Sequence, residues 1–347
     1  MKAIQMYRRG GGFLTALLLV SFLFSFSSCS GGTSYVGTGG GTSGGTTYKV
    51  TVETSTNGGV AADKTTGVAE GEKITLTVTP ETGYKLDALT VKDGGSNAVS
   101  TTEVTEGTSY TFKMPASNVT VSATFKAMLG SKASPDAVGD IVFKDGSAEP
   151  YSAGLTLTDE QKAAAIAVIF DADKKLGVGL MQGTDKMWAK NGTAGYGNIA
   201  TLLATKTTSG SNAGDAEFSG AGASDGSTSL GTFKDFVKNN GNDYSDENYS
   251  AWYWIENYAA TAGLTGAYAS GWYMPSIKEL CDLYKAKEAV NNSINKTGGT
   301  QMSISWFWSS SQYTYSGIAW TVNFGFGKLT NDDKYSTGSV CAVRAFN

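Results

Sequence analysis

The chain has 347 residues, a net charge of −4 and no histidine. This length suits two domains behind a leader rather than one small domain. Lys and Arg (27) do not outnumber Asp and Glu (31), and no basic stripe stands out, which argues against nucleic acid as a partner. Without histidine the chain has no Ser-His or Cys-His nucleophile pair and no His-ligated metal site.

The first residues have the pattern of an export signal. A positively charged segment is followed by an apolar run from Phe13 to Phe26, shorter than the ~20 residues that a membrane-spanning helix needs. We therefore predict a signal peptide over residues 1–28. The ending Phe-Ser-Ser-Cys29 resembles a bacterial lipobox, although Leu is usual where Phe26 stands. The resemblance implies a lipidated Cys29 on the outer membrane; cleavage without lipidation is the alternative.

Residues 29–47 are rich in Gly, Ser and Thr and show no apolar period. Such a composition predicts a flexible coil. We interpret this segment as a tether that lifts the folded part of the chain off a membrane surface.

Residues 48–126 alternate apolar and polar side chains in several short runs. The runs are Tyr48 to Val52, Ile74 to Val78, Tyr110 to Met114 and Val119 to Phe125. A period of two predicts antiparallel strands with one solvated face, so this region is expected to be an all-β domain.

The segment Met114-Pro-Ala-Ser-Asn-Val-Thr-Val121 carries a family resemblance. Together with the strands around it, it resembles the divergent internalin-B-type repeat of bacterial surface proteins. The resemblance implies a small spacer or adhesion module without chemistry of its own. The chain has a single copy, so no solenoid is expected.

The region 135–347 mixes helix and strand signals. Three buried strands are expected, at Ile141–Phe143, Ala164–Phe170 and Gly177–Met181, although the alanines of the second also fit a helix. Helix signals comprise two capping boxes and three weaker segments. They are Thr158 with Gln161, Ser276 with Glu279, a short helix near Ile199–Ala204, Phe233–Val237, and Asn248–Ala262.

From Trp306 onward the pattern returns to strands. Trp320, Val322 and Phe324 are expected on one face of a strand, with Thr321 and Asn323 on the other. The remaining expected features are a hairpin turn at Gly325–Gly327 that exposes Phe326, a second turn at Asn331–Lys334, and a closing strand at Val340–Phe346. We predict that Ile141–Phe143 shares a sheet with that closing strand.

Three motifs carry a second family resemblance: Gly271-Trp-Tyr-Met-Pro-Ser-Ile-Lys-Glu-Leu280, Trp308-Ser-Ser-Ser311 and Val343-Arg-Ala-Phe346. They resemble the C-terminal domain first named in Legionella collagen-like proteins, a relative of the formylglycine-generating-enzyme type of C-type lectin fold. The fold class implied for the chain is α+β, with a small all-β repeat domain followed by a C-type-lectin-like α+β domain over 135–347. In some relatives the last stretch is diversified, so a diversified binder is one interpretation.

The candidate binding residues are aromatic or small polar residues near the turns after Trp308. They are Tyr313, Tyr315, Thr321, Asn323, Phe326, Asp332 and Tyr335. Tyrosine offers wide amphipathic contact at a low ordering cost. The residues expected to be structural are Trp272, Trp308, Trp320, Val322, Arg344 and Phe346, with Arg344 expected to pair with a buried carboxylate or carbonyl.

Other chemistry finds little support in the sequence. The Glu-Pro-Asn, Gln-Pro-Asp and Trp-Asn-Asp boxes of calcium-dependent sugar lectins are missing, so no metal and no cofactor is expected. Cys281 and Cys341 lack the local setting of the reactive cysteine pair in formylglycine-generating enzymes; a disulfide between them is left open. We expect a surface lipoprotein, not an enzyme, and we expect it to bind a protein or glycan on another surface. The alternatives are a passive coat protein and a polysaccharide-acting enzyme.

Overall fold

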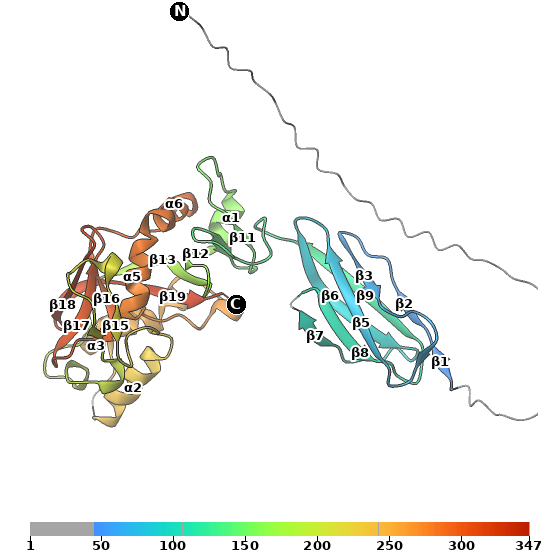
Figure 1. Ribbon diagram of the computed structural model, residues 1–347, viewed down its shortest axis with the longest axis horizontal. Helices are drawn as coiled ribbons and strands as arrows, with labels where there is room; N and C mark the ends of the chain where they lie inside the picture. Colours follow the sequence, from blue (N-terminus) through green and yellow to red (C-terminus); the bar gives the residue numbers. More distant parts are fainter. Residues whose placement is uncertain (1–44, 106, 242, 347) are drawn as a thin grey trace, which may run out of the picture. The chain divides into compact units, whose positions relative to one another are not determined.

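The computed structural model describes residues 45–105, 107–241 and 243–346 (Figure 1). The predicted signal peptide, the predicted lipidation site at Cys29 and most of the predicted linker lie outside these ranges. Two folded units follow each other along the chain, first an all-β unit and then a mixed α+β unit. Within the described ranges, no helix combines the length and the apolar character needed to span a bilayer.

Strands β1 to β9 build the first unit. They are β1 (Thr47–Tyr48), β2 (Val50–Val52), β3 (Gly58–Ala62), β4 (Val68–Ala69), β5 (Lys73–Pro80), β6 (Tyr84–Asp93), β7 (Thr102–Thr105), β8 (Ser109–Lys113) and β9 (Val119–Ala127). One sheet has the order β2-β9-β6, a second has the order β3-β5-β8-β7, and β1 pairs with β4. The prediction of an all-β domain is confirmed.

The core of the first unit follows the alternation in the sequence. Ile74, Leu76 and Val78 of β5 are buried, as are Val91 of β6 and Phe112 of β8, whereas the threonines between the β5 residues are more exposed. One face of each strand thus enters the core and the other meets water. Strand β3 was not predicted, because its small residues, Gly-Gly-Val-Ala-Ala, give no alternation signal.

The second unit is built around one eight-stranded sheet with the order β11-β10-β12-β13-β19-β16-β17-β18. Its strands are β10 (Ile141–Phe143), β11 (Ala148–Glu149), β12 (Ala165–Asp171), β13 (Leu176–Met187), β16 (Trp306–Gln312), β17 (Ile318–Asn323), β18 (Lys328–Asp333) and β19 (Thr337–Ala345). Two short strands, β14 (Thr205–Lys206) and β15 (Phe218–Ser219), pair with each other apart from this sheet.

The two ends of the second unit meet in this sheet, as predicted. Strand β13 pairs with β12 along one edge and with β19 along the other, so β10 and the closing strand β19 share a single sheet. All three residues of β10 are buried. A short strand without exposed side chains needs cover on both faces of the sheet, and the helices of the unit provide it.

The helices are α1 (Asp159–Ala164), α2 (Ser229–Asn239), α3 (Asp246–Glu256), α4 (Tyr258–Thr261), α5 (Ile277–Lys285) and α6 (Lys287–Thr297). Single 3-10 turns occur at η1 (Ala194–Tyr196), η2 (Ala200–Leu202), η3 (Ala213–Asp215) and η4 (Gly266–Tyr268). Both predicted capping boxes are present, since Thr158 caps α1 with Gln161 and Ser276 caps α5 with Glu279.

Helices cover both faces of the sheet (Figure 1). On one face, α5 and α6 pack against a core that contains Phe307 and Val322. On the other face, α2 and α3 pack against a core that contains Trp308 and Ala319. Strand β16 therefore places Phe307 in one core and its neighbour Trp308 in the other.

The predicted burial of the central tryptophans is confirmed, because Trp308 is 1% and Trp320 4% exposed. Trp320, Val322 and Phe324 enter the same core, as the alternation indicated. Val322 is completely buried, and Trp272 and Phe346 are also buried, so these members of the predicted frame are structural.

Three local predictions are wrong. The expected single helix at Asn248–Ala262 is interrupted, because Asn257 leaves helical geometry and α4 starts afresh after it. The expected helix near Ile199–Ala204 is only the turn η2. The expected turn at Asn331–Lys334 is mostly strand, since β18 continues to Asp333 and the turn begins at Lys334. Polar residues mimic a turn there, whereas an edge strand tolerates them because it is exposed to water.

Candidate functional site

The turn between β16 and β17 carries the first pair of predicted contact residues. Tyr313 is half-buried, and its ring packs edge-on against the buried Trp320, with centroids 4.9 Å apart. Its other neighbour is Tyr315, at 5.5 Å between centroids. Tyr315 is 71% exposed. Tyr313 thus connects the buried Trp320 to an exposed tyrosine through edge-on ring contacts.

The next pair lies at the end of β18 and in the turn that follows it. Tyr335 is 56% exposed, and its amide donates to Oδ1 of Asp333 at 2.8 Å. The predicted contact residue Asp332 is exposed, but its Oδ1 accepts bonds from the Asp333 amide and the Ser336 hydroxyl. Asp332 therefore helps to shape the turn that displays Tyr335.

These two turns are joined by backbone hydrogen bonds. The Lys334 amide donates to the Gly317 carbonyl at 2.7 Å, and Ile318 of β17 lies opposite Asp333 of β18. Tyr315 and Tyr335 are each within two residues of these contacts. We call these two exposed side chains, on their connected turns, the Tyr315–Tyr335 surface.

Tyr196, which the sequence analysis did not single out, locks the two turns together. Its carbonyl accepts from the Gly317 amide at 2.8 Å, and its hydroxyl donates to Oδ2 of Asp333 at 2.8 Å. The Tyr196 ring also lies against Gly317, where a Cβ would approach it to 2.8 Å. Gly317 has a φ of 80°, so glycine suits this position on both counts.

Lys334, also missed, lies beneath the Tyr315–Tyr335 surface with its side chain fully buried. Its ammonium donates to the carbonyls of Gly195 and Gly197 and to Oε1 of Gln312, at 2.8–3.0 Å. It also lies 4.3 Å from the centre of the Trp188 ring. Burial lowers the pKa of Lys334 to about 7. One cation thus connects the η1 loop, the end of β16 and the turn after β18.

Phe326, another predicted contact residue, lies elsewhere. It is 88% exposed at the β17–β18 hairpin, as predicted, and Ile304 nearby is 83% exposed. This hairpin and the Tyr315–Tyr335 surface lie at opposite ends of the β17–β18 pair, which runs from Asn323 opposite Lys328 to Ile318 opposite Asp333. Five residue steps of about 3.4 Å separate those ends by roughly 17 Å. The predicted contact residues therefore do not form one cluster.

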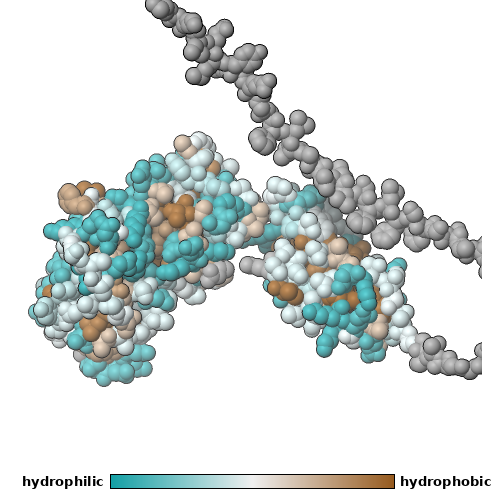
Figure 2. Space-filling model, viewed as in Figure 1, coloured by the Kyte–Doolittle hydropathy of each residue, from teal (hydrophilic) through white to brown (hydrophobic). Residues whose placement is uncertain are grey.

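The structure contradicts the predicted contact role of two residues. Thr321 and Asn323 are only 2% and 3% exposed. Thr321 shares a hydrogen bond of 2.8 Å with the Thr330 hydroxyl on the neighbouring strand. Asn323 accepts from the amides of Gly325 and Phe326 and so caps the hairpin. The alternation of apolar and polar residues predicted that both side chains lie on the solvated face of β17. In the structure, neighbouring elements cover that face. In the view of Figure 2, hydrophobic side chains form several small, separate patches on this unit.

Arg344 also differs from its predicted role. Instead of pairing with a carboxylate or carbonyl, its guanidinium stacks 5.1 Å from the centre of the Tyr268 ring, and its Nε and Nη1 have no hydrogen-bond partner among the described residues. Desolvation lowers its pKa. The frame tryptophans behave as expected: the indole of Trp308 donates to the Lys186 carbonyl, and that of Trp320 donates to the Ala204 carbonyl.

The two cysteines of the second unit are free thiols and do not form the disulfide that the sequence left open. Both are completely buried, and burial raises the pKa of Cys281 and of Cys341 to about 12. A buried thiol with a raised pKa is a poor nucleophile, because the thiolate is the reactive form. We assign both cysteines to the core.

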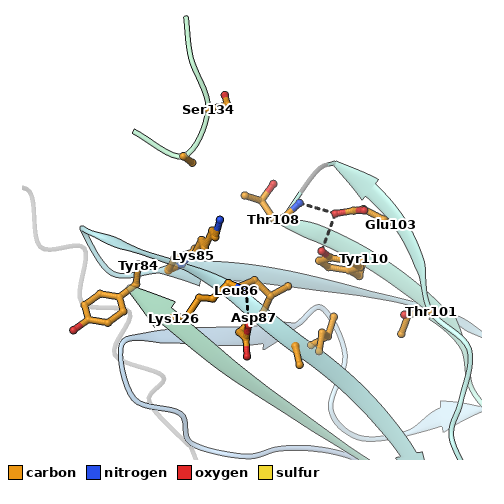
Figure 3. A pocket seen from close by; sticks show the side chains of 15 residues that line it. Tyr84, Lys85, Leu86, Asp87, Thr101, Glu103, Thr108, Tyr110, Lys126 and Ser134 are labelled. Atoms are coloured by element: carbon orange, nitrogen blue, oxygen red, sulfur yellow. Dashed lines mark hydrogen bonds and ion pairs between the residues drawn. The ribbon is translucent and has the colours of Figure 1, made fainter. Parts of the chain in front are cut away.

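The first unit contains a hollow between β6 and the β7–β8 hairpin (Figure 3). Glu103 accepts bonds there from the Tyr110 hydroxyl and the Gly107 amide, at 2.7 and 2.6 Å. Asp87 pairs with Lys126 at 2.7 Å. Since these carboxylates already have partners within the domain, the hollow resembles a structural feature of the repeat more than a polar binding site.

Comparison with known families assigns both units. Residues 48–129 match the divergent InlB B-repeat domain, and residues 183–344 match the Lcl C-terminal domain, which has an FGE-sulfatase-like fold. No curated protein and no solved structure matches the chain.

Proposed function

Because the chain joins a divergent InlB B-repeat domain to an Lcl C-terminal domain, we propose that it is a surface lipoprotein whose C-terminal domain binds a protein or glycan on another surface. The InlB-type repeat itself indicates a surface protein. The lipobox-like ending before Cys29 supports an outer-membrane lipid anchor, with the repeat domain as a spacer.

The observation that carries the binding proposal is the fixed geometry of the Tyr315–Tyr335 surface. Tyr315 and Tyr335 are exposed, whereas Lys334 beneath them is buried and Tyr196 is half-buried, and both of these side chains are hydrogen-bonded. Aromatic side chains on rigid turns can meet a partner without a large loss of conformational entropy. Tyrosine adds wide contact area with a polar hydroxyl, which suits both proteins and glycans.

The experiment uses the full-length protein, immobilised and exposed to surface proteins extracted from host and bacterial cells and, separately, to a glycan array. A central interface tyrosine is worth about 2 kcal/mol or more. We therefore expect the double variant Tyr315→Ala and Tyr335→Ala to weaken binding by at least tenfold. Tyr253→Ala is the matched control, because Tyr253 is an exposed tyrosine on α3.

A second control separates the two ends of the hairpin. Phe326→Ala should leave binding unchanged if the Tyr315–Tyr335 surface is the site. Retained binding in the double tyrosine variant, with lost binding in Phe326→Ala, would move the site to the hairpin tip. Equal binding by all variants would contradict both locations.

The alternative of a passive coat protein is favoured by one observation: the β17–β18 pair, roughly 17 Å long, separates the hairpin of Phe326 from the Tyr315–Tyr335 surface. Scattered exposed aromatics are what a surface without a partner would show. A coat protein would retain no ligand in either assay. Specific capture that depends on Tyr315 and Tyr335 would exclude it.

A further inference from the structure

A cavity of about 410 Å³ lies in the second unit at the end of β19. Its lining includes Lys174, Asp225, Ser227, Tyr273, Glu279 and Arg344. Tyr335 precedes β19, whereas Arg344 is the last residue but one of this nine-residue strand. At about 3.3 Å per residue, the cavity and the Tyr315–Tyr335 surface lie at opposite ends of a strand roughly 26 Å long. This cavity is therefore independent of the proposed binding surface.

Arg344 is the unusual group in the cavity wall. The Nε and Nη1 atoms are buried, and neither has an acceptor among the described residues, an arrangement that costs free energy because both donors lose their hydrogen bonds to water. The guanidinium is held in place by the rings of Tyr268 and Phe346, at 5.1 and 6.0 Å. Gly271 makes room for it, since a Cβ there would lie 2.8 Å from Nη1. The fold thus positions this cation, and no carboxylate of the described residues forms an ion pair with it.

Glu279, a carboxylate in the wall of the cavity, already has hydrogen-bond partners. Its Oε1 accepts from the Tyr273 hydroxyl at 2.9 Å, and its Oε2 accepts from the amides of Ser276 and Gly226, at 2.8 and 3.0 Å. These bonds hold the wall of the cavity together. The oxygens of Glu279 thus have hydrogen-bond partners other than Arg344. Because Nε and Nη1 of Arg344 are enclosed, a ligand would meet Arg344 at Nη2, which is not among the enclosed unpaired atoms.

The rim of the cavity carries a second cation, Lys174, and polar groups that can form hydrogen bonds with ligand hydroxyls. The Lys174 side chain is 54% exposed, and its ammonium lies 3.9 Å from Asp171, which leaves donors available. Asp225 is exposed, and its Oδ1 accepts from the Ser227 amide at 2.8 Å. The exposed hydroxyl of Ser227 lines the same opening. The cavity thus has one cation, Arg344, in its wall, and a second cation with polar groups of both kinds at its rim.

We propose that this cavity binds a small ligand through a carboxylate group, which Arg344 receives with Lys174 at the rim. Nη2 of Arg344 carries two N–H groups of a permanent cation, and hydrogen bonds from a cation to a carboxylate are stronger than those between neutral groups. Asp225 and Ser227 then contact a hydroxyl or amide beside that carboxylate. Two sources share this chemistry, an acidic sugar and the carboxyl terminus of a peptide.

Isothermal titration of the full-length protein distinguishes these sources. D-glucuronate represents the acidic sugar and N-acetyl-L-alanine the peptide terminus, with D-glucose and N-acetyl-L-alaninamide as their uncharged counterparts. We expect at least one carboxylate to bind with a dissociation constant on the order of 1 mM, and its uncharged counterpart to bind at least tenfold more weakly. Equal binding of charged and uncharged compounds, or no binding of either carboxylate at several times that concentration, would overturn the proposal.

Variants test the residues. Arg344→Lys keeps the charge but replaces the planar guanidinium with a compact ammonium that does not place its donors at the position of Nη2. It should weaken binding about tenfold, or about 1.4 kcal/mol. Lys174→Gln should weaken it about threefold, because an exposed charge contributes little. Lys238→Gln, an exposed lysine on α2 outside the cavity, is the matched control and should bind like the unaltered protein.

Circular dichroism shows whether each variant is folded. If Arg344→Lys does not fold, the two variants at the exposed rim, Lys174→Gln and Ser227→Ala, test whether the ligand binds in this cavity. Carboxylate binding that is unchanged in both rim variants would place the ligand elsewhere and contradict the proposed site. A weakening confined to these variants, and not shared by Lys238→Gln, would support it.

Discussion

Replacement of Lys334 by methionine should abolish one specific pH dependence of stability. In the folded protein, burial lowers the pKa of Lys334 from 10.5 to about 7, even though three oxygen acceptors and the Trp188 ring favour the charged form. Between pH 6 and 8 the unfolded chain therefore keeps the proton while the folded protein releases it. Because the unfolded state binds more protons, the free energy of unfolding rises with pH in this window.

The magnitude follows from the two pKa values. Ionisation of one group with a pKa of 7 folded and 10.5 unfolded adds about 1.4 kcal/mol to the free energy of unfolding between pH 6 and 8. The chain has no histidine to add its own titration in this window. The buried Cys281 and Cys341 have raised pKa values and act in the opposite direction, but mainly above pH 8. Burial also raises the pKa of Glu279, which acts in the opposite direction, so the contribution of Lys334 is obtained by comparing two proteins that differ only at this residue.

The assay is chemical denaturation of the full-length protein and of Lys334→Met at several pH values between 6 and 8. Groups other than Lys334 are common to both proteins, so the difference between their unfolding free energies should change by about 1.4 kcal/mol. Lys328→Met, which removes an exposed lysine from β18, should follow the unaltered protein. Parallel curves for the unaltered protein and Lys334→Met would show that the carbonyl acceptors hold the pKa near its ordinary value, and would refute the reasoning.

Three further predictions concern the core and the N-terminus. Trp308→Ala and Trp320→Ala should each cost about 3–5 kcal/mol in chemical denaturation, because both rings are buried, whereas a loss below about 1 kcal/mol would place that ring on the surface. A thiol reagent at pH 8 should leave Cys281 and Cys341 unmodified until denaturant is added, and rapid labelling of the native protein would contradict their burial. Mass spectrometry of the native N-terminal peptide should find a lipidated Cys29; an unmodified Cys29, or cleavage at another position, would exclude the lipid anchor.

Local patterns identified most of the frame. Period-two alternation located β5, β8 and β9, and the capping boxes located the starts of α1 and α5, because each signal depends on residues close together in the chain. The exposure of Phe326 also follows from local sequence, since glycines on both sides favour a tight turn. Family resemblance correctly assigned both units.

The candidate site depended on contacts that no local pattern encodes. Lys334 is joined to Gly195 and Tyr196 to Asp333, each across more than a hundred residues of chain. Asn323 and Thr321 have ordinary surface chemistry, yet neighbouring strands bury them. Arg344 has the sequence setting of a paired arginine, but aromatic rings rather than an anion surround its guanidinium.

The sequence by itself determined which side chains could be exposed aromatics or core anchors, because hydrophobicity and spacing act over a few residues. Only the tertiary structure decided which of these side chains lie together. The β17–β18 register separates Phe326 from Tyr315, and the closure of the sheet through β13 and β19 places Arg344 at its cavity. Burial, the pKa of Lys334 and the surroundings of Arg344, where no described acceptor meets Nε or Nη1, are all set by distant segments that meet only when the sheet has closed.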